Sequence, residues 1–171
     1  MKLFNSIKYL LIILIVTIGI VITPLGVQAK TLRWKTMPVK VCIPDNQYKP
    51  LMKRAFFEWM NITNGKVKFL YTCTSPEITI SYSPQKNKSL TNYSYTSDGY
   101  IFKSHIDMAL LTREGKVMED DVLLLVMEHE IAHALGISGH VNTPNSIMQP
   151  TVKKGYTITA DILAEINKRY K

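Results

Sequence analysis

Hydrophobic residues between positions 38 and 83 follow two different periods, and each period predicts one kind of element. In 48–60 they recur at spacings of three, four and seven, which predicts an amphipathic helix. Alternating apolar and polar residues in 38–43 and 77–83 predict strands, and 67–73 predicts another between them. This strand, helix, strand order favours a right-handed crossover and a partly parallel sheet.

The next segment predicts a β-hairpin. Ser97-Asp98-Gly99 is a turn sequence between two strand-like segments, 91–96 and 100–110. The first of these segments carries few hydrophobic residues, as an edge strand would.

Two further helices are predicted beyond the hairpin. Residues 122–135 are apolar nearly all round and follow three acidic residues, so we expect a buried helix that Gly136 ends. Thr159-Ala160-Asp161 begins a last helix that continues to about Tyr170. The expected fold class is therefore α+β: a twisted mixed sheet of about five strands with an antiparallel edge strand, two main helices and a C-terminal helix.

The beginning of the chain has the layout of a secretory signal peptide. A basic start precedes an apolar run, 9–22, and a small-residue ending, Val27-Gln28-Ala29. We expect residues 1–29 to be the signal peptide and 30–171 to be one exported domain. An uncleaved membrane anchor is the alternative. In both cases the domain is secreted or lies at the cell surface.

The exported part is basic, and its basic residues are scattered. Without the two lysines of the leader, 19 basic and 13 acidic side chains give a net charge of +6. This charge favours association with an anionic cell surface or envelope. No aromatic-basic module of the kind that binds nucleic acid is present in the sequence, so no nucleic-acid partner is expected. The sequence does not indicate an oligomeric state.

Cys42 and Cys73 are the two cysteines of the chain. Export makes a disulfide possible, and two buried thiols are the alternative, since each cysteine lies in or beside an apolar strand-like segment. Both readings stay open at the level of sequence.

The segment from His129 to His133 (HEIAH) carries the clearest chemistry. The two histidines are four residues apart on a predicted helix, so both imidazoles point from one face and can meet one zinc ion. Glu130 is placed to hold a water molecule on that metal and take its proton.

Two residues compete to be the third ligand: Glu165 from the last helix and His140 from the loop after Gly136. Gly136 stands seven residues after His129, where a glycine can turn the chain back without strain. His140, however, follows one residue later than the pattern H-E-x-x-H-x-x-G-x-x-H allows.

The stretch HEIAHALGISGH, 129–140, together with SIMQP, 146–150, resembles the zinc motif and Met-turn of metzincin metallopeptidases, in particular small bacterial matrixins. Met148 lies eight residues beyond His140, a spacing familiar from matrixins, so the extra residue falls in the loop before the ligand. The resemblance favours His140 over Glu165 and loosely covers most of the chain after residue 36. It implies a metzincin-like catalytic domain.

The resemblance also implies the metal chemistry. His129, His133 and His140 would bind one catalytic zinc ion, and Glu130 would activate the zinc-bound water to hydrolyse peptide bonds. Met148 would pack beneath the metal without binding it. Structural calcium or a second zinc ion is not expected, because no loop rich in histidine and aspartate is present in the sequence.

The implied substrate is an extended peptide or protein. It would pair with the edge strand through Tyr93, Ser94 and Tyr95, as an added strand. Pro150 and Thr151 would form a wall of the pocket for the side chain that follows the scissile bond. Gln149 stands where matrixins usually have tyrosine, so the specificity of that pocket is not implied.

The leading hypothesis is therefore an extracellular zinc endopeptidase. The alternatives are a non-catalytic surface or interaction protein stabilised by zinc, and an amidase that acts on cell-wall peptides. The presence of Glu130 argues against the non-catalytic alternative, because a structural zinc site needs no base.

Overall fold

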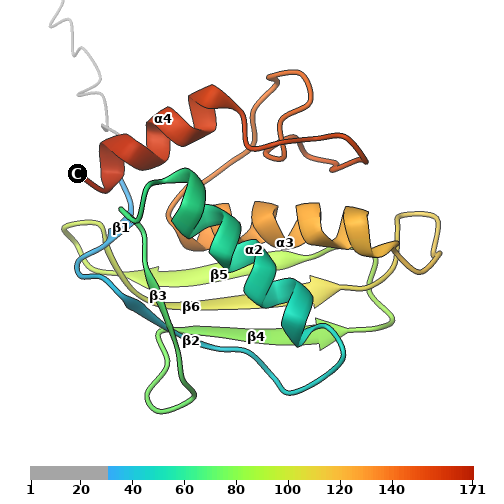
Figure 1. Cartoon of the computed structure of the whole chain (residues 1–171), viewed down its shortest axis with the longest axis horizontal. Helices are drawn as coiled ribbons and strands as arrows, with labels where there is room; N and C mark the ends of the chain where they lie inside the picture. The colour runs from blue at the N-terminus through green and yellow to red at the C-terminus, as the bar shows by residue number, and fades with distance from the viewer. Residues whose placement is uncertain (1–30) are drawn as a thin grey trace, which may run out of the picture.

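The computed structural model describes residues 31–171, so the leader expected at 1–29 lies outside the described residues. Among those described residues, none of the helices combines the length and the apolar character needed to cross a membrane. One mixed sheet runs through the molecule, with helices packed against it (Figure 1).

The sheet has the strand order β1-β6-β4-β2-β3, and β5 also pairs with β6. All of its strand pairs are parallel except that of β5 with β6, which is antiparallel. The strands are β1 (Arg33–Trp34), β2 (Val39–Cys42), β3 (Phe69–Tyr71), β4 (Ile78–Ser83), β5 (Leu90–Tyr95) and β6 (Tyr100–Ala109). The mixed sheet and its antiparallel edge strand were both predicted; the two-residue strand β1 was not.

The three helices are α2 (Lys49–Ile62), α3 (Asp120–Ala134) and α4 (Ala160–Arg169). Figure 1 shows α2 and α3 on the same side of the sheet, and α3 contacts α2, β5 and β6. The predicted helices are confirmed, with boundaries that differ by one or two residues. The architecture is the α+β arrangement expected from the sequence.

The core lies between the sheet and these two helices. Val39 and Val41 alternate inward from β2, and Met52, Phe56 and Trp59 of α2 are fully buried against them. Each such side chain contributes about 1.5–3 kcal/mol by leaving water. Because α3 also lies inside this core, the helix that carries the histidines is held rigidly.

A disulfide joins Cys42 of β2 to Cys73, just after β3, with the two Cα atoms 4.5 Å apart. The two strands are parallel neighbours, and this adjacency brings the two cysteines together. Of the two alternatives that the sequence left open, the structure has the disulfide.

Candidate active site

The C-terminal half of α3 carries His129, Glu130 and His133, and Gly136 reverses the chain just beyond it. The N–H of Gly136 donates to the carbonyl of His133, and the glycine has a φ of 99°. A Cβ atom at this position would lie 2.2 Å from the carbonyl oxygen of Leu32. Only glycine satisfies both constraints, so it directs residues 137–140 back over the helix.

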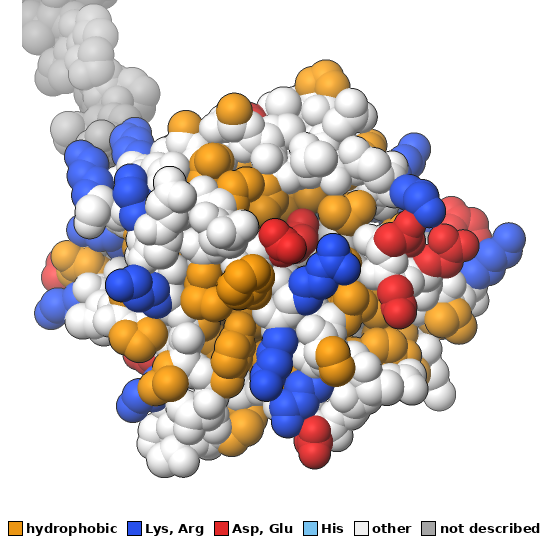
Figure 2. All heavy atoms as spheres, viewed as in Figure 1, with side chains coloured by type: hydrophobic (Ala, Val, Ile, Leu, Met, Phe, Trp, Pro, Cys, Tyr) orange, Lys and Arg blue, Asp and Glu red, His pale blue; other side chains and the backbone are white. Residues whose placement is uncertain are grey.

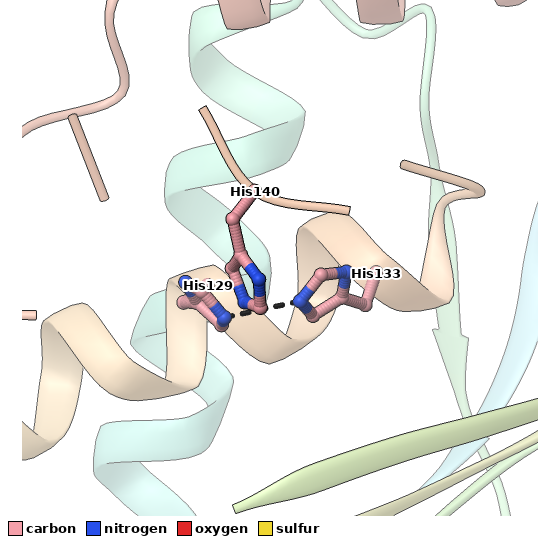
Figure 3. A group of neighbouring side chains, drawn as sticks. All are labelled: His129, His133 and His140. Atoms are coloured by element: carbon pink, nitrogen blue, oxygen red, sulfur yellow. Dashed lines mark hydrogen bonds between the residues drawn. The ribbon is translucent and has the colours of Figure 1, made fainter. Parts of the chain in front are cut away.

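The reversed loop brings His140 to the two histidines of α3. One ligand nitrogen from each of the three lies within 4.8 Å of the others. The ring of His140 stacks on that of His129 with centroids 5.2 Å apart, and lies 5.3 Å from the ring of His133. Figure 3 shows the three rings converging, His140 from the loop and the other two from one face of α3.

Backbone carbonyls determine the tautomers of the two helical histidines. Nδ1 of His129 lies 2.5 Å from the carbonyl oxygen of Ile147, and Nδ1 of His133 lies 2.6 Å from that of Ile137. A carbonyl oxygen only accepts, so both Nδ1 atoms carry the proton and both Nε2 atoms present lone pairs. These two Nε2 atoms lie 3.0 Å apart. Two facing lone pairs need a cation between them, and this donor set fits zinc.

The electrostatics keep these rings neutral. Burial lowers the pKa of His129 to about 4, a change that the hydrogen bond to Ile147 opposes in part. Burial also lowers the pKa of His133 and, with a smaller contribution from Lys88, that of His140. Neutral imidazole is the form that binds a metal. His140 itself is exposed, so the trio is accessible from solvent on that side.

Glu130 is buried beside the histidines, with 4% of its surface exposed. Its Oε2 atom accepts a hydrogen bond of 2.6 Å from the hydroxyl of Thr91 on β5. Burial raises the pKa of Glu130 to about 7, while the Thr91 hydrogen bond and the charge of Lys88 both oppose that rise. A carboxyl group with this pKa can accept and release a proton near neutral pH.

The histidines and Glu130 open into a cavity of about 680 Å³. Its walls come from five parts of the chain: β5 and the loop before it, residues 112–118, α3, the loop that carries His140, and residues 150–153. Val122 and Val126 of α3, together with Met118, give the lining an apolar part. Its lining residues include Thr91, Tyr93, Met118, Val122, Val126 and Pro150.

The residues expected to bind substrate are only partly brought to this cavity. Tyr93, Pro150 and Thr151 line it, whereas Ser94 and Tyr95 lie exposed on β5 outside its lining. In an extended strand, alternate side chains point to opposite faces, so Tyr93 and Ser94 cannot both face the cavity.

Several lining residues were not singled out from the sequence, among them Thr91, Met118, Val122 and Val126. Val126 and Val122 lie four and eight residues before Glu130, about one and two turns earlier on the same side of α3. This spacing would have indicated both as cavity residues. No local pattern marks Met118, which comes from the loop before the helix.

Met148 is fully buried, and its backbone carbonyl accepts a 2.9 Å hydrogen bond from the N–H of Val141. The carbonyl oxygen of the neighbouring Ile147 accepts a hydrogen bond from His129, so the segment around Met148 orients the histidine trio without contributing a ligand atom. Glu165 lies outside the trio and accepts a 2.7 Å hydrogen bond from Arg169 on its own helix.

His105 of β6 is exposed, away from the trio. Its two ring nitrogens lie 2.9 Å and 3.0 Å from the hydroxyls of Thr79 and Ser81 on β4. It is a polar residue of the outer sheet face. Among the described residues, the group of side chains able to hold a metal is the histidine trio.

The model of the matrixin family matches residues 27–171 of this chain. Among solved structures, the chain is similar to one titled "Structure of myroilysin", with a TM-score of 0.52 and 15% sequence identity. That match covers 81% of this chain and 95% of the other, and at this identity it bears on the fold alone. No curated protein matches the sequence.

Proposed function

The chain belongs to the matrixin family and is a zinc metallopeptidase, and from this premise we propose that it is an extracellular endopeptidase. The observation that carries the proposal is the meeting of three features in one cavity: two facing Nε2 lone pairs, a third histidine and a buried Glu130. A site that only stabilises the fold needs neither the carboxyl group nor the cavity.

We assign His129, His133 and His140 as the zinc ligands. The carbonyl contacts of His129 and His133 support this assignment, because they orient both rings and raise the basicity of the ligand atoms. When bound there, zinc supplies a Lewis acid that lowers the pKa of water to about 7 and polarises the carbonyl group to be attacked. Met148 packs under the trio as the Met-turn residue.

Glu130 is the general base in this proposal. Its carboxylate takes a proton from the attacking water and returns it to the amine that leaves. The pKa of about 7 supports the role, since a base that must also act as an acid works best near the ambient pH. Its burial also keeps bulk water from competing for the proton.

The cleft favours cleavage within a chain over cleavage at its end. Within residues 31–171, β5 pairs only with β6, so its other edge is available to an added peptide strand. The cavity continues past the histidines toward Met118, Val122 and Val126, which are suited to a large apolar side chain of the substrate. Pro150 and Thr151 also line it.

We propose that the protein acts outside the cell, either secreted or held by its N-terminal segment. The disulfide supports this location, because such bonds persist in oxidising compartments. The net charge of +6 for residues 30–171 favours association with an anionic envelope. On the face that Figure 2 shows, Lys and Arg side chains are spread among hydrophobic and uncharged ones.

The test compares the purified protein with Glu130→Ala. The parent should hold one zinc ion per chain and cleave a broad peptide library at internal bonds, mapped by mass spectrometry. The variant should keep its zinc and lose turnover by roughly a hundredfold or more, the scale of a general base. If Glu130→Ala cleaves as fast as the parent, Glu130 is not the base. If the parent removes only terminal residues, it is not an endopeptidase.

A further inference from the structure

Thr91 of β5 makes two contacts with the residue proposed as the base. Its hydroxyl oxygen lies 2.6 Å from Oε2 of Glu130 and 3.1 Å from the backbone carbonyl oxygen of the same residue. A hydroxyl carries one proton, and the shorter contact is the one to the carboxylate. A hydrogen bond from a hydroxyl to a carboxylate is among the stronger ones in proteins.

The position of this hydroxyl follows from the geometry of β5. Thr91 and Tyr93 are half-buried, while Leu90, Asn92 and Ser94 are exposed, so the strand turns Thr91 and Tyr93 toward α3. Thr91 pairs with Ile106, a core residue of β6. The strand register therefore holds the hydroxyl in place.

We propose that Thr91 is a positioning residue for Glu130. Its hydroxyl holds Oε2 and so leaves the other carboxylate oxygen, Oε1, to exchange protons with the water and the leaving amine. Glu130 has three rotatable side-chain bonds, and within the described part of the chain Thr91 is the hydrogen-bond partner of its carboxylate. Without this contact, the carboxylate samples other orientations that do not transfer a proton.

The contact also joins two functions in one residue. Thr91 belongs to the strand whose free edge is proposed to bind the substrate backbone, and its side chain orients the base. A substrate that pairs with β5 is thereby aligned with the base through a single rigid element. This inference rests on the proposed function, because it takes Glu130 to be the base.

The kinetic test uses Thr91→Val and Thr91→Ser in the full protein, with a peptide that the parent cleaves. Valine keeps the shape and the β-branching but removes the hydroxyl; serine keeps the hydroxyl. We expect Thr91→Val to lower kcat roughly ten- to a hundredfold, the range for losing a hydrogen bond to a charged group, with KM and zinc content unchanged. Thr91→Ser should restore most of kcat.

The matched control is Thr79→Val, which removes a hydroxyl from the outer face of the same sheet and should leave kcat at the parent value. Two kinetic results overturn the proposal. One is a Thr91→Val variant with the kcat of the parent. The other is a Thr91→Ser variant as slow as Thr91→Val, which would mean that the methyl group, through packing, is what counts.

A second readout needs no turnover. In a crystal structure of the zinc-loaded parent, the Thr91 hydroxyl should lie within hydrogen-bond distance of the Glu130 carboxylate. A carboxylate turned away from Thr91 there overturns the proposal, even if Thr91→Val fails to fold. Should the parent cleave no peptide, the proposed function fails, and this structure still decides whether Thr91 positions Glu130.

Discussion

At the residue scale, Gly136 determines whether the chain can carry His140 back over α3. Its positive φ is available to most residues only at the cost of strain, and the nearby Leu32 carbonyl leaves no space for a side chain. The two constraints are separate, since the first concerns the conformation of one residue and the second concerns its packing.

Gly136→Ala should destabilise the protein by about 1–3 kcal/mol more than Gly155→Ala, as estimated for overpacking. Gly155 also has a positive φ, 86°, but a Cβ there would meet nothing within 4 Å. Comparing the two variants therefore separates the effect of the clash with Leu32 from the strain of a positive φ. Urea unfolding of both variants measures the difference, and equal losses of stability would show that the Leu32 carbonyl moves aside without cost.

His140→Ala should weaken zinc binding by more than the roughly 10- to 100-fold typical of losing an outer-shell partner. Of the three histidines, His140 is the exposed one that the loop supplies. Competition with a chelator of known affinity measures the change. Glu165→Gln is the control and should bind zinc as the parent does, because Glu165 pairs with Arg169. Normal affinity in His140→Ala would exclude it as a ligand.

At this scale, contacts between residues that are near one another in the chain could be predicted from the sequence, and contacts between distant residues could not. His129, Glu130 and His133 are related by helical spacing, and His140 by a short loop, so their meeting was predictable. The contact between Thr91 and Glu130 was not, because it depends on how β5 lies over α3. The cavity residue Met118 was missed for the same reason.

At the scale of elements, the strands with clear alternation were predicted and β1 was not. Its two residues, Arg33 and Trp34, form a strand only because β6 lies beside them, and two residues carry no period. The disulfide was undecided because pairing of Cys42 with Cys73 requires that β2 and β3 be neighbours, which the sequence order favours but does not require.

The packing of α2 on α3 contains a carboxyl group that the proposed reaction does not use. Glu128 of α3 is 7% exposed, and the indole N–H of Trp59 on α2 donates to its backbone carbonyl. Burial raises the pKa of Glu128 from its ordinary 4.5 to about 7; the charge of Glu58 adds to the rise and that of Arg54 opposes it. The folded state therefore prefers the protonated form.

Glu128→Gln should stabilise the protein more at pH 8 than at pH 5. A raised folded-state pKa means that the contribution of Glu128 to stability is present at low pH and is lost as the pH rises through about 7. Glutamine mimics the protonated acid at every pH. The gap between variant and parent should widen by roughly 2 kcal/mol between these pH values. Urea unfolding of zinc-free protein at both pH values measures the gap, and a constant gap would contradict the expectation.

At the scale of the whole molecule, residues from both ends of the described chain meet at the end of α3. The backbone N–H of Trp34 donates to the hydroxyl of Tyr170 over 3.1 Å, and that hydroxyl donates to the carbonyl of Leu135 over 2.9 Å. The indole N–H of Trp34 donates to the carbonyl of Ala134. Two carbonyls at the helix end, otherwise without helical partners, are thereby satisfied.

Tyr170→Phe should lower the free energy of unfolding by about 1–3 kcal/mol, because it leaves a buried N–H and a buried carbonyl without their partner. Tyr156→Phe is the matched control: its hydroxyl donates to Gln149 at a partly exposed position, so water can replace it. Urea unfolding compares the two. An equal, small loss in both would mean that water reaches the site of Tyr170 as well.

The hydrogen bond from Tyr170 to Leu135 has a consequence for biosynthesis. The ribosome adds all three proposed zinc ligands before it adds Tyr170, so a growing chain holds them before the end of α3 can be anchored. A peptidase that became active while half-made would endanger the cell that makes it. Because the Tyr170 hydroxyl bonds the carbonyl of Leu135, we expect a nascent chain to anchor the end of α3 fully only after synthesis has passed Tyr170.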